Sequence, residues 1–315
     1  MPLASLRSSI LEYRKENGRT YHSLSDSRHV QIRHCSPTNR ITHACIVTAD
    51  LTHHLWMLTW DGEICNCPKK DGAYRVLDVG TGTGVWALDY GCHRVPHLEI
   101  AQADVLQVIG VDLSPIQPDY VFSNCSFEVD DIEKEWLWPE PFDFIFVRSM
   151  IGSFCDWKEF LAKAYDNLEP GGYIELQDNV FPMKCDDGTM TDDFVPLRWH
   201  RLLIEASGKM GRPCTVPPLF EQMLTDAGFV DVKVRREKWP INGWAKDPRM
   251  RELGEWCQAS ALSGIEAVSL ALFTRVLGWS VLQTSVFCAE VRNAHKAIGV
   301  HAYYDVYAVW GRKPW

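Results

Sequence analysis

The chain has 315 residues, of which 46% are hydrophobic and 23% are charged, so it can form one large domain or two small ones with a substantial core. Its formal net charge of -9 and its pI near 5.7 argue against direct nucleic-acid binding, which requires a basic face. No window approaches about 18 consecutive apolar residues, and the N-terminus lacks the long apolar core of a secretory signal, so we expect neither a membrane span nor export.

The first predicted element is an amphipathic helix over residues 5–21, which ends in the sequence ENGR. Residues 22–50 show no clear period and are predicted as loop. Residues 51–62 are apolar at helical spacing and stop at Gly62, which is typical of a helix C-terminus.

Short apolar runs bounded by turns follow, and helix-like stretches separate several of them. Strands are predicted at residues 74–80, 107–112, 125–131, 142–149, 172–178, 228–239 and 301–313. Helices are predicted at residues 83–91, 156–168, 193–210 and 217–228, and the stretch between the last two strands is mostly helical. The sequence EPGG at 169–172 is interpreted as the turn before the fifth strand. Strands that alternate with helices imply crossover connections and a parallel sheet, so the expected fold class is α/β.

The first of these strands runs into the loop Asp78-Val79-Gly80-Thr81-Gly82-Thr83-Gly84. Glycines are needed where the backbone turns left-handed, or where a ligand lies against it with no Cβ between them. A nucleotide triphosphate loop would require GxxxxGK[ST], and a dinucleotide loop would have its third glycine at the position of Val85. With both excluded, S-adenosylmethionine (SAM) remains, because it has no phosphates and its methionine carboxylate and amine would lie over such a loop.

The two vicinal hydroxyls of the SAM ribose require one carboxylate acceptor at the end of the second strand. Asp104 lies at the spacing of about 20 residues from Gly84 that such an acid commonly shows, but it follows a poor strand. Asp112 lies further on and ends the β-branched run QVIGV. We therefore predict that Asp112 binds the ribose and that residues 92–106 are extra sequence in the connection.

The third predicted strand ends in the sequence FEVDDIEKEW. Either Asp130 or Asp131 lies where the adenine amino group of SAM could donate a hydrogen bond to it. The alternative is that the same aspartate caps a helix.

Eleven cysteines are spread singly along the chain, apart from Cys65 and Cys67. No CxxC pair accompanies them, so we interpret them as small buried hydrophobic residues of a reducing compartment, without a metal site. The expected location is intracellular, with the cytoplasm favoured over the nucleus.

With these residues, the chain resembles class I SAM-dependent methyltransferases and, more narrowly, the LaeA-like methyltransferases of filamentous fungi. The stretches that carry the resemblance run from about residue 13 to the C-terminus. They are ENGRTYH, HHLWMLTWDG, RVLDVGTGTGVWALD, VIGVDLSPIQP, FEVDDIEKEWLWPEPFDFIFVRS, LEPGGYIELQD, LLIEASGKMGRP, SLALFTRVLGW and HAYYDVYAVWGRKP. The run VIGVDLSPIQP and the tryptophan after the glycine loop are specific to that family, whereas the glycine loop alone is not.

The resemblance implies a Rossmann-like sheet of seven strands with helical inserts that form a lid. Its parts would be an N-terminal helical lid over 1–72, a SAM-binding core over 73–180, and the last two strands with substrate-lid inserts over 181–315. It assigns the glycines of the loop to SAM, Asp112 to the ribose, Asp131 with the backbone of Ile132 to adenine, and Arg148 with Ser149 to the methionine moiety. The expected cofactor-binding residues are therefore Asp78, Gly80, Thr81, Gly82, Gly84, Asp112, Leu113, Asp131, Ile132 and Arg148.

Two stretches depart from the family pattern. The link from Gly84 to Asp112 is longer than usual, and residues 24–50 replace a shorter acidic stretch. Both are rich in histidine and cysteine, and each is either a genuine variation within the family or the product of a translated intron or a mispredicted exon junction.

The function implied is transfer of a methyl group to oxygen or nitrogen of a small molecule in fungal secondary metabolism. The alternatives are a LaeA-type nuclear regulator that acts through protein partners, and a pseudo-enzyme that binds SAM only for structure. The intact glycine loop and Asp112 favour the enzyme, and the lack of a Lys/Arg cluster disfavours nuclear import.

The acceptor pocket is expected beyond the carboxyl ends of the strands, under residues 181–215 and 240–297 and the N-terminal helix. Its candidate aromatic residues are Phe194, Trp199, Trp244, Trp256 and Trp279. Histidines that could act as a base are His22, His200 and the pair His53-His54, and we assign no catalytic base among them.

Overall fold

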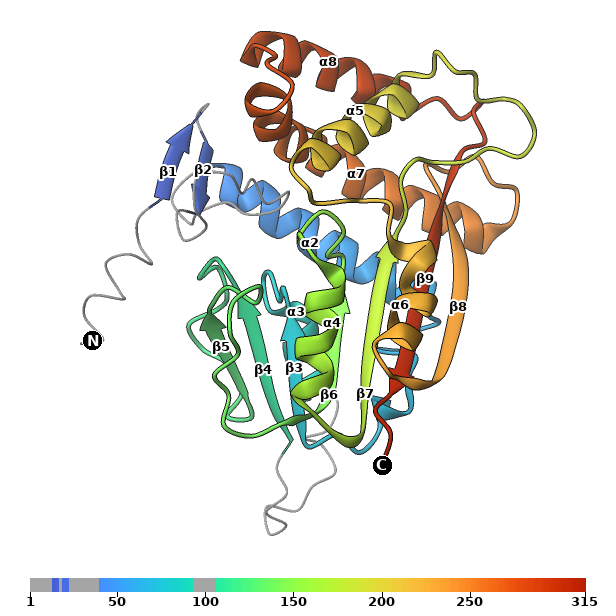
Figure 1. Cartoon of the computed structure of the whole chain (residues 1–315). Coiled ribbons are helices and arrows are strands. Elements are labelled where there is room, and N and C mark those ends of the chain that lie inside the picture. The colour runs from blue at the N-terminus through green and yellow to red at the C-terminus, as the bar shows by residue number, and fades with distance from the viewer. Residues whose placement is uncertain (1–12, 17–18, 23–39, 93–105) are drawn as a thin grey trace.

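A seven-stranded sheet carries a cap of helices at one end (Figure 1). A computed structural model describes residues 13–16, 19–22, 40–92 and 106–315 of the chain. The strands of the sheet are β3 (Arg75–Val79), β4 (Gln107–Asp112), β5 (Cys125–Val129), β6 (Phe142–Arg148), β7 (Leu168–Asn179), β8 (Val230–Pro240) and β9 (Tyr303–Arg312). Each corresponds to one strand predicted from the sequence.

The order of these strands is β5-β4-β3-β6-β7-β9-β8. The pairs from β5 to β7 are parallel, whereas β9 runs antiparallel to both β7 and β8. β3 and β6 are almost entirely buried, which explains why RVLDV and FDFIFVR are nearly continuous apolar runs. The expected α/β sheet is therefore confirmed.

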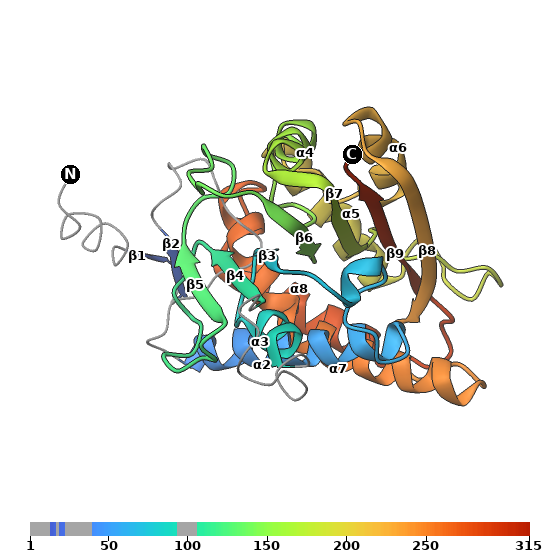
Figure 2. The same cartoon turned by 90° about the horizontal axis from the view of Figure 1, so that it is seen from below.

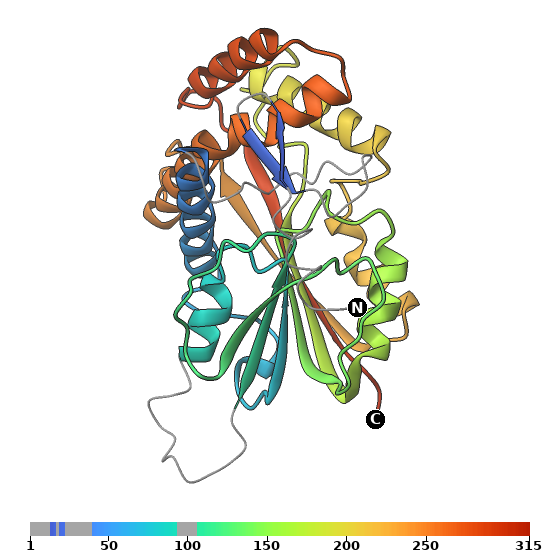
Figure 3. The ribbon, with the colours of Figure 1, turned by 90° about the vertical axis from the view of Figure 1, so that its left-hand side faces the viewer.

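Helices cover both faces of the sheet (Figure 2). On one side lie α2 (Arg40–Thr59), α3 (Val85–Cys92) and α7 (Pro248–Arg275), and on the other lie α4 (Trp157–Asp166) and α6 (Phe220–Asp226). α5 (Val195–Lys209) and α8 (Val281–Ala294) lie beyond the strand ends, as Figure 3 shows with the sheet seen nearly edge-on. Two short 3-10 helices, η1 (Pro68–Lys70) and η3 (Pro217–Leu219), complete the described helices. We call α2, α5, α7 and α8 together the helical cap.

Local sequence signals explain where the main helices begin. The Asp156 side chain caps α4 by accepting from the backbone N–H groups of Lys158 and Glu159. Asp247 caps α7, which has a proline in its first turn, and Ser280 with Gln283 forms a capping box at the start of α8.

Residues 13–16 and 19–22 form two paired strands, so the helix predicted over 5–21 is wrong for the part of it that the structure describes. β1 (Tyr13–Glu16) pairs antiparallel with β2 (Arg19–His22), with Tyr13 opposite His22. The dipeptide Asn17-Gly18 between them is the strongest short hairpin signal, and it outweighs the amphipathic helical pattern of the predicted helix. Residues 5–12, 17 and 18 of the predicted helix lie outside the described residues.

Two element boundaries also differ from the prediction. α2 begins at Arg40, inside the stretch predicted as loop, and it is stabilised by packing along α7, which local sequence does not reveal. β7 begins at Leu168, so EPGG lies inside the strand. Gly171 has φ +81° there, and the register between β6 and β7 shifts at this place, so the sequence forms an irregularity and not a turn.

By length and composition alone, α7 is the one helix among the described residues that could cross a membrane, with a mean hydropathy of 1.2 over its most apolar window. The core helices of water-soluble proteins share these properties. In this chain α7 packs along α2 and closes the cavity described below.

Candidate active site

The glycine loop connects β3 to α3 and is tied to the neighbouring strand. The backbone N–H groups of Gly80 and Thr81 both donate to the carbonyl of Val111 in β4, at 2.9 and 3.0 Å. Gly80, Gly82 and Gly84 have φ of +70°, +57° and +80°, a region that other residues rarely adopt. The sequence therefore needs glycine at all three positions.

Asp112, at the end of β4, holds this loop from the side. Its buried carboxylate accepts from the backbone N–H of Gly82 at 2.9 Å and from that of Ser114 at 3.0 Å. The structure thus brings together the two features from which SAM was predicted, the loop and the acid after the second parallel strand.

The three glycines differ in what surrounds them. A Cβ on Gly84 would lie 2.3 Å from the ring of Phe127, and one on Gly80 would lie 2.2 Å from the sulfur of Met150. A Cβ on Gly82 would face open space, with the Gly80 carbonyl oxygen at 4.0 Å as its nearest neighbour. A bare backbone that faces open space beside a buried carboxylate fits the amino-acid and ribose parts of SAM.

A cavity of about 280 Å³ begins at this loop and extends across the strand ends. It reaches from Asp112, after β4, to Tyr304, at the start of β9, so it crosses the ends of β3, β6 and β7. Helices α2 and α7 roof it. We call the two ends of this cavity the β4 side and the β9 side.

Most of the predicted cofactor residues line the cavity. These are Asp78, Gly80, Thr81, Gly82, Asp112 and Arg148, together with Ser149. Gly84, Leu113, Asp131 and Ile132 are not among the lining residues. The Asp131 side chain accepts from the backbone N–H of Glu133 at 3.2 Å, as a turn aspartate does, so its contact with adenine stays a prediction.

Asp78 is a buried acid at the mouth of the loop. Its carboxylate accepts from the Thr81 hydroxyl at 2.6 Å. Burial raises the pKa of Asp78 to about 6, although the Thr81 hydrogen bond and the positive charge of Arg148 oppose this effect. Arg148 offsets this burial only in part, so a further cation placed in the cavity beside Asp78 would stabilise its ionised carboxylate.

Arg148 is held by a histidine of the cap. Its Nη2 atom lies 2.8 Å from Nδ1 of His53, and Nε2 of His53 lies 2.8 Å from the Asp89 carboxylate. Because a guanidinium only donates, Nδ1 accepts and Nε2 carries the proton that is donated to Asp89. Burial lowers the pKa of His53, so the ring is neutral at pH 7 with both nitrogens occupied. His53 therefore joins α2 to β6 and α3 and is not free to act as a base.

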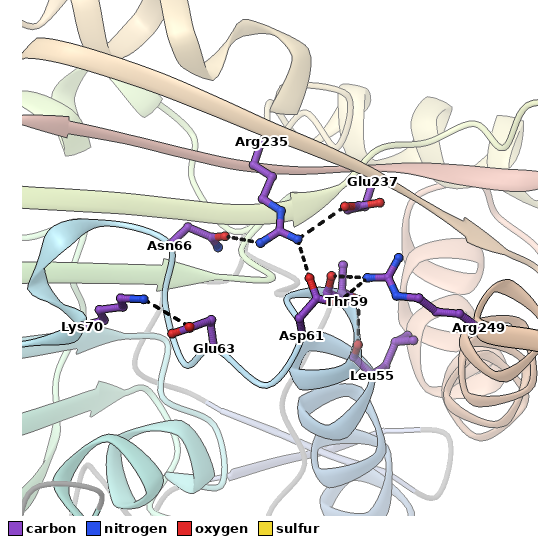
Figure 4. Close-up of polar contacts among 9 residues, drawn as sticks. All are labelled: Leu55, Thr59, Asp61, Glu63, Asn66, Lys70, Arg235, Glu237 and Arg249. Atoms are coloured by element: carbon purple, nitrogen blue, oxygen red, sulfur yellow. Dashed lines mark hydrogen bonds and ion pairs between the residues drawn. The ribbon is translucent and has the colours of Figure 1, made fainter.

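The C-terminal end of α2 is fixed by a charged cluster (Figure 4). Asp61 accepts from Arg235 of β8 at 2.8 Å and from Arg249 of α7 at 3.0 Å, and Arg249 also donates to the Thr59 carbonyl at 3.1 Å. Hydrogen bonding from Arg235 and the charge of Arg249 lower the pKa of the Asp61 carboxyl. The cluster sets the position of α2, and with it the roof of the cavity.

Cys65, Cys67 and Glu175 form the one group among the described residues with ligand atoms close enough to hold a metal, within 4.8 Å of one another. Glu175 is fully buried, and its oxygens accept from the backbone N–H groups of Asn66 and Cys67 and from the side-chain amides of Asn66 and Gln177. These hydrogen bonds already occupy both oxygens of the carboxylate. Its evident role is to fasten the segment between α2 and β3.

The β9 side of the cavity is aromatic, but only in part through the predicted residues. Of the five aromatic candidates, Trp199 lines the cavity, whereas Phe194, Trp244, Trp256 and Trp279 are not among the lining residues. The aromatic lining also includes Trp56, Phe181, Trp239 and Tyr304. Trp56 and Trp239 pack edge to face at 4.6 Å, and the Trp239 indole donates to Thr59 at 2.7 Å. Of these four residues, Trp56 and Phe181 lie in stretches that the sequence placed in the lid, whereas Trp239 and Tyr304 lie on predicted strands.

Gly82→Ala is expected to weaken SAM binding more than it lowers stability. A side chain at φ +57° costs about 1–2 kcal/mol, and the added methyl would occupy the open space of the cavity. Gly84→Ala is the matched comparison, because its methyl would collide with Phe127 and mainly lower the free energy of unfolding. Urea unfolding and calorimetric titration with S-adenosylhomocysteine measure the two effects, and similar losses of affinity in both variants would contradict the assignment.

Comparison with known proteins adds to this geometry. A family model described as a methyltransferase domain matches residues 60–234. The chain is 34% identical to the methyltransferase pytC of Aspergillus terreus, over 99% of this chain and 91% of that protein. It is 32% identical to the probable methyltransferase tdiE of Emericella nidulans, over 84% of this chain and 80% of that protein.

Further relatives carry other names. The chain is 28% identical to the protein-methionine methyltransferase laeA of Emericella nidulans, over 99% of this chain and 80% of that protein. It is 29% identical to the secondary metabolism regulator LAE1 of Cochliobolus heterostrophus, over 95% of this chain and 94% of that protein. Among solved structures, a phosphoethanolamine N-methyltransferase of Haemonchus contortus superposes with a TM-score of 0.50 at 16% identity, covering 99% of this chain and 73% of that one. At that identity the likeness concerns the fold alone.

Proposed function

The chain belongs to the methyltransferase family, and on that premise we propose that it transfers a methyl group from SAM to a small, flat organic acceptor of fungal secondary metabolism. The observation that carries this proposal is the shape of the cavity. It is continuous from the glycine loop to an aromatic end beneath α2 and α7. One end suits the cofactor and the other suits an apolar, planar molecule.

The β4 side would hold SAM through the residues of the loop and its neighbours. Gly82 leaves the backbone bare, Asp112 offers a carboxylate to the ribose hydroxyls, and Asp78 offers one to the methionine amine. Arg148, fixed by His53, supplies the positive charge that a methionine carboxylate requires. Bound SAM supplies an electrophilic methyl group on a sulfonium centre.

The β9 side would orient the acceptor and exclude water. Trp56, Trp199, Trp239 and Phe181 offer flat apolar faces, and the roof formed by α2 and α7 shields the reacting atoms from bulk solvent. Methyl transfer to a nucleophilic atom is driven largely by such positioning. No described histidine lines the cavity with a free ring nitrogen, so we assign no general base.

A second candidate function follows from the relatives named secondary metabolism regulators and protein-methionine methyltransferase. In that case the acceptor would be a protein side chain, and the chain would act in the nucleus with protein partners. The roof over the cavity favours a compact acceptor over an extended peptide. As part of the same proposal, we place the protein in the cytoplasm.

Deletion of the gene in its fungal host is expected to cause accumulation of one unmethylated precursor, with a fluorescently tagged copy in the cytoplasm. Metabolite profiling by mass spectrometry and fluorescence microscopy measure the two results. Simultaneous loss of many unrelated metabolites, with the tagged protein in the nucleus, would decide for the regulator.

A further inference from the structure

Tyr304 and His200 form a buried polar pair on the β9 side of the cavity. Tyr304, near the start of β9, lines the cavity, and its hydroxyl lies 3.1 Å from Nε2 of His200 in α5. His200 is fully buried, and its ring stacks on Phe181 at 4.5 Å. No role in cofactor binding explains this pair, because it lies on the opposite side of the cavity from Asp112.

The other nitrogen of His200 decides the direction of the hydrogen bond. The backbone N–H of Met183 lies 3.3 Å from Nδ1 of His200 and can only donate, so Nδ1 is the unprotonated nitrogen. In a neutral imidazole the proton then resides on Nε2. His200 therefore donates to the hydroxyl oxygen of Tyr304.

This arrangement leaves the hydroxyl proton of Tyr304 facing away from His200. A phenolic O–H prefers the plane of its ring, which allows two directions, and the Nε2–H of His200 occupies one of them. The remaining direction leads away from His200, and the described residues place no other hydrogen-bond partner on the hydroxyl. Within a buried, largely aromatic site, a donor of this kind gains most when a ligand supplies the acceptor.

We infer that Tyr304 donates a hydrogen bond to an oxygen of the methyl acceptor, so that the site selects flat molecules with a carbonyl or similar acceptor oxygen. This inference rests on the proposed function and names the acceptor chemistry within it. The oxygen that Tyr304 contacts is not the atom that becomes methylated, because a donated hydrogen bond lowers the nucleophilicity of an oxygen. Tyr304 is thus a specificity-determining residue, and His200 positions it.

The electrostatic surroundings agree with a donor role. Burial raises the pKa of Tyr304 well above its usual value, so the hydroxyl keeps its proton and is not a base. Burial likewise lowers the pKa of His200 well below its usual value, and nearby His295 adds to this effect. His200 consequently stays neutral at pH 7, and the direction of the hydrogen bond is maintained.

The test uses two bicyclic probes that differ only at one group, 1-indanone with its carbonyl and indane with a methylene. Both are titrated by ligand-observed NMR into the full chain saturated with S-adenosylhomocysteine. Tyr304→Phe is expected to weaken binding of 1-indanone roughly three- to ten-fold, as the loss of one neutral hydrogen bond predicts, and to change binding of indane less than two-fold. The ratio of the four dissociation constants isolates the contact between hydroxyl and carbonyl.

Tyr303→Phe is the matched control. Tyr303 precedes Tyr304 on the same strand, its hydroxyl donates to Asp186 at 2.7 Å, and it does not line the cavity. This variant is expected to leave both probes unaffected. The ¹³C shift of the bound carbonyl gives a second readout, which moves downfield in the wild type and not in Tyr304→Phe.

The inference would be overturned if Tyr304→Phe changed the dissociation constants of both probes equally. It would also be overturned if the wild type bound 1-indanone no more tightly than indane. Failure of the proposed function would look different. In that case S-adenosylhomocysteine would not bind to the wild-type chain, or deletion of the gene would not cause one unmethylated precursor to accumulate, whereas the inference on Tyr304 can fail with both of these results intact.

Discussion

Asp112→Ala is expected to weaken binding of SAM by about 2–4 kcal/mol, which is a loss of roughly 30- to 1,000-fold in affinity. The carboxylate is predicted to accept hydrogen bonds from both ribose hydroxyls. It also accepts from the backbone N–H of Gly82, at 2.9 Å, and so holds the loop on which the cofactor would lie. The substitution therefore removes a ligand contact and the restraint on the loop together.

Isothermal titration calorimetry with SAM and S-adenosylhomocysteine measures this loss. NAD and ATP serve as negative ligands, because the loop lacks the glycine spacing of the first and the lysine required for the second. Asp104→Ala is the matched control and should change the affinity little. A larger loss for Asp104 than for Asp112 would mean that the ribose acid had been assigned to the wrong strand end.

The sequence predicts the sheet well because buried parallel strands have a distinctive composition. RVLDV, QVIGVD and FDFIFVR are short apolar runs, and each ends at a residue where the chain reaches the cavity or its edge. The loop after β3 and the acid after β4 follow directly, because parallel strands bring their carboxyl ends to one edge of the sheet. Asp78, Gly82, Asp112 and Arg148 are found at the cavity for this reason.

The roof of the cavity depends on contacts between segments far apart in the sequence, which no local pattern contains. Thr52 of α2 and Ser260 of α7 lie 2.6 Å apart, although 208 positions separate them. The early start of α2 and the placement of α7 against it result from such contacts. Tyr304 is a similar case, because strand alternation shows that Tyr303 and Tyr304 point to opposite faces but not which one meets His200. The pairing of β1 with β2 is a different case, because the local signal for it, Asn17-Gly18, is present in the sequence and could have corrected the predicted helix.

Asp78→Asn is expected to stabilise the ligand-free protein and to impair cofactor binding. The pKa of Asp78 is raised to about 6 in the folded chain from a reference value of 3.8, so between these values the folded state binds more protons than the unfolded state. The free energy of unfolding therefore falls as pH rises from about 4 to about 6. Above that range Asp78 is ionised, and its buried charge continues to destabilise the folded state. Removing the charge should raise the free energy of unfolding at pH 8 by roughly 1–3 kcal/mol, as measured by urea denaturation.

Binding has the opposite dependence on pH. The methionine amine of SAM is a cation that pairs with the ionised form of Asp78, so wild-type affinity should fall as pH decreases through about 6. Asp78→Asn should bind SAM at least about tenfold more weakly at pH 7, where the amine is still mostly protonated, and its affinity should no longer change between pH 5 and pH 7. Calorimetric titrations between pH 5 and pH 8 compare the two proteins.

Asp143→Asn is the control that shows whether the effects of Asp78→Asn on stability and on SAM affinity would follow from neutralising any buried aspartate. Asp143 is also buried, but it accepts from Lys69 at 2.9 Å and from the backbone N–H groups of Tyr74 and Arg75, and it does not line the cavity. Its carboxylate is compensated by these donors, so neutralising it should lower the free energy of unfolding by roughly 1–3 kcal/mol and leave cofactor affinity unchanged. Opposite signs of the stability change are expected at the two aspartates, because Lys69 offsets the burial of Asp143, whereas the charge of Arg148 offsets that of Asp78 only in part. If Asp78→Asn instead lowered stability as Asp143→Asn does, the charge of Asp78 would be satisfied without the cofactor, and its assignment to the methionine amine would be wrong.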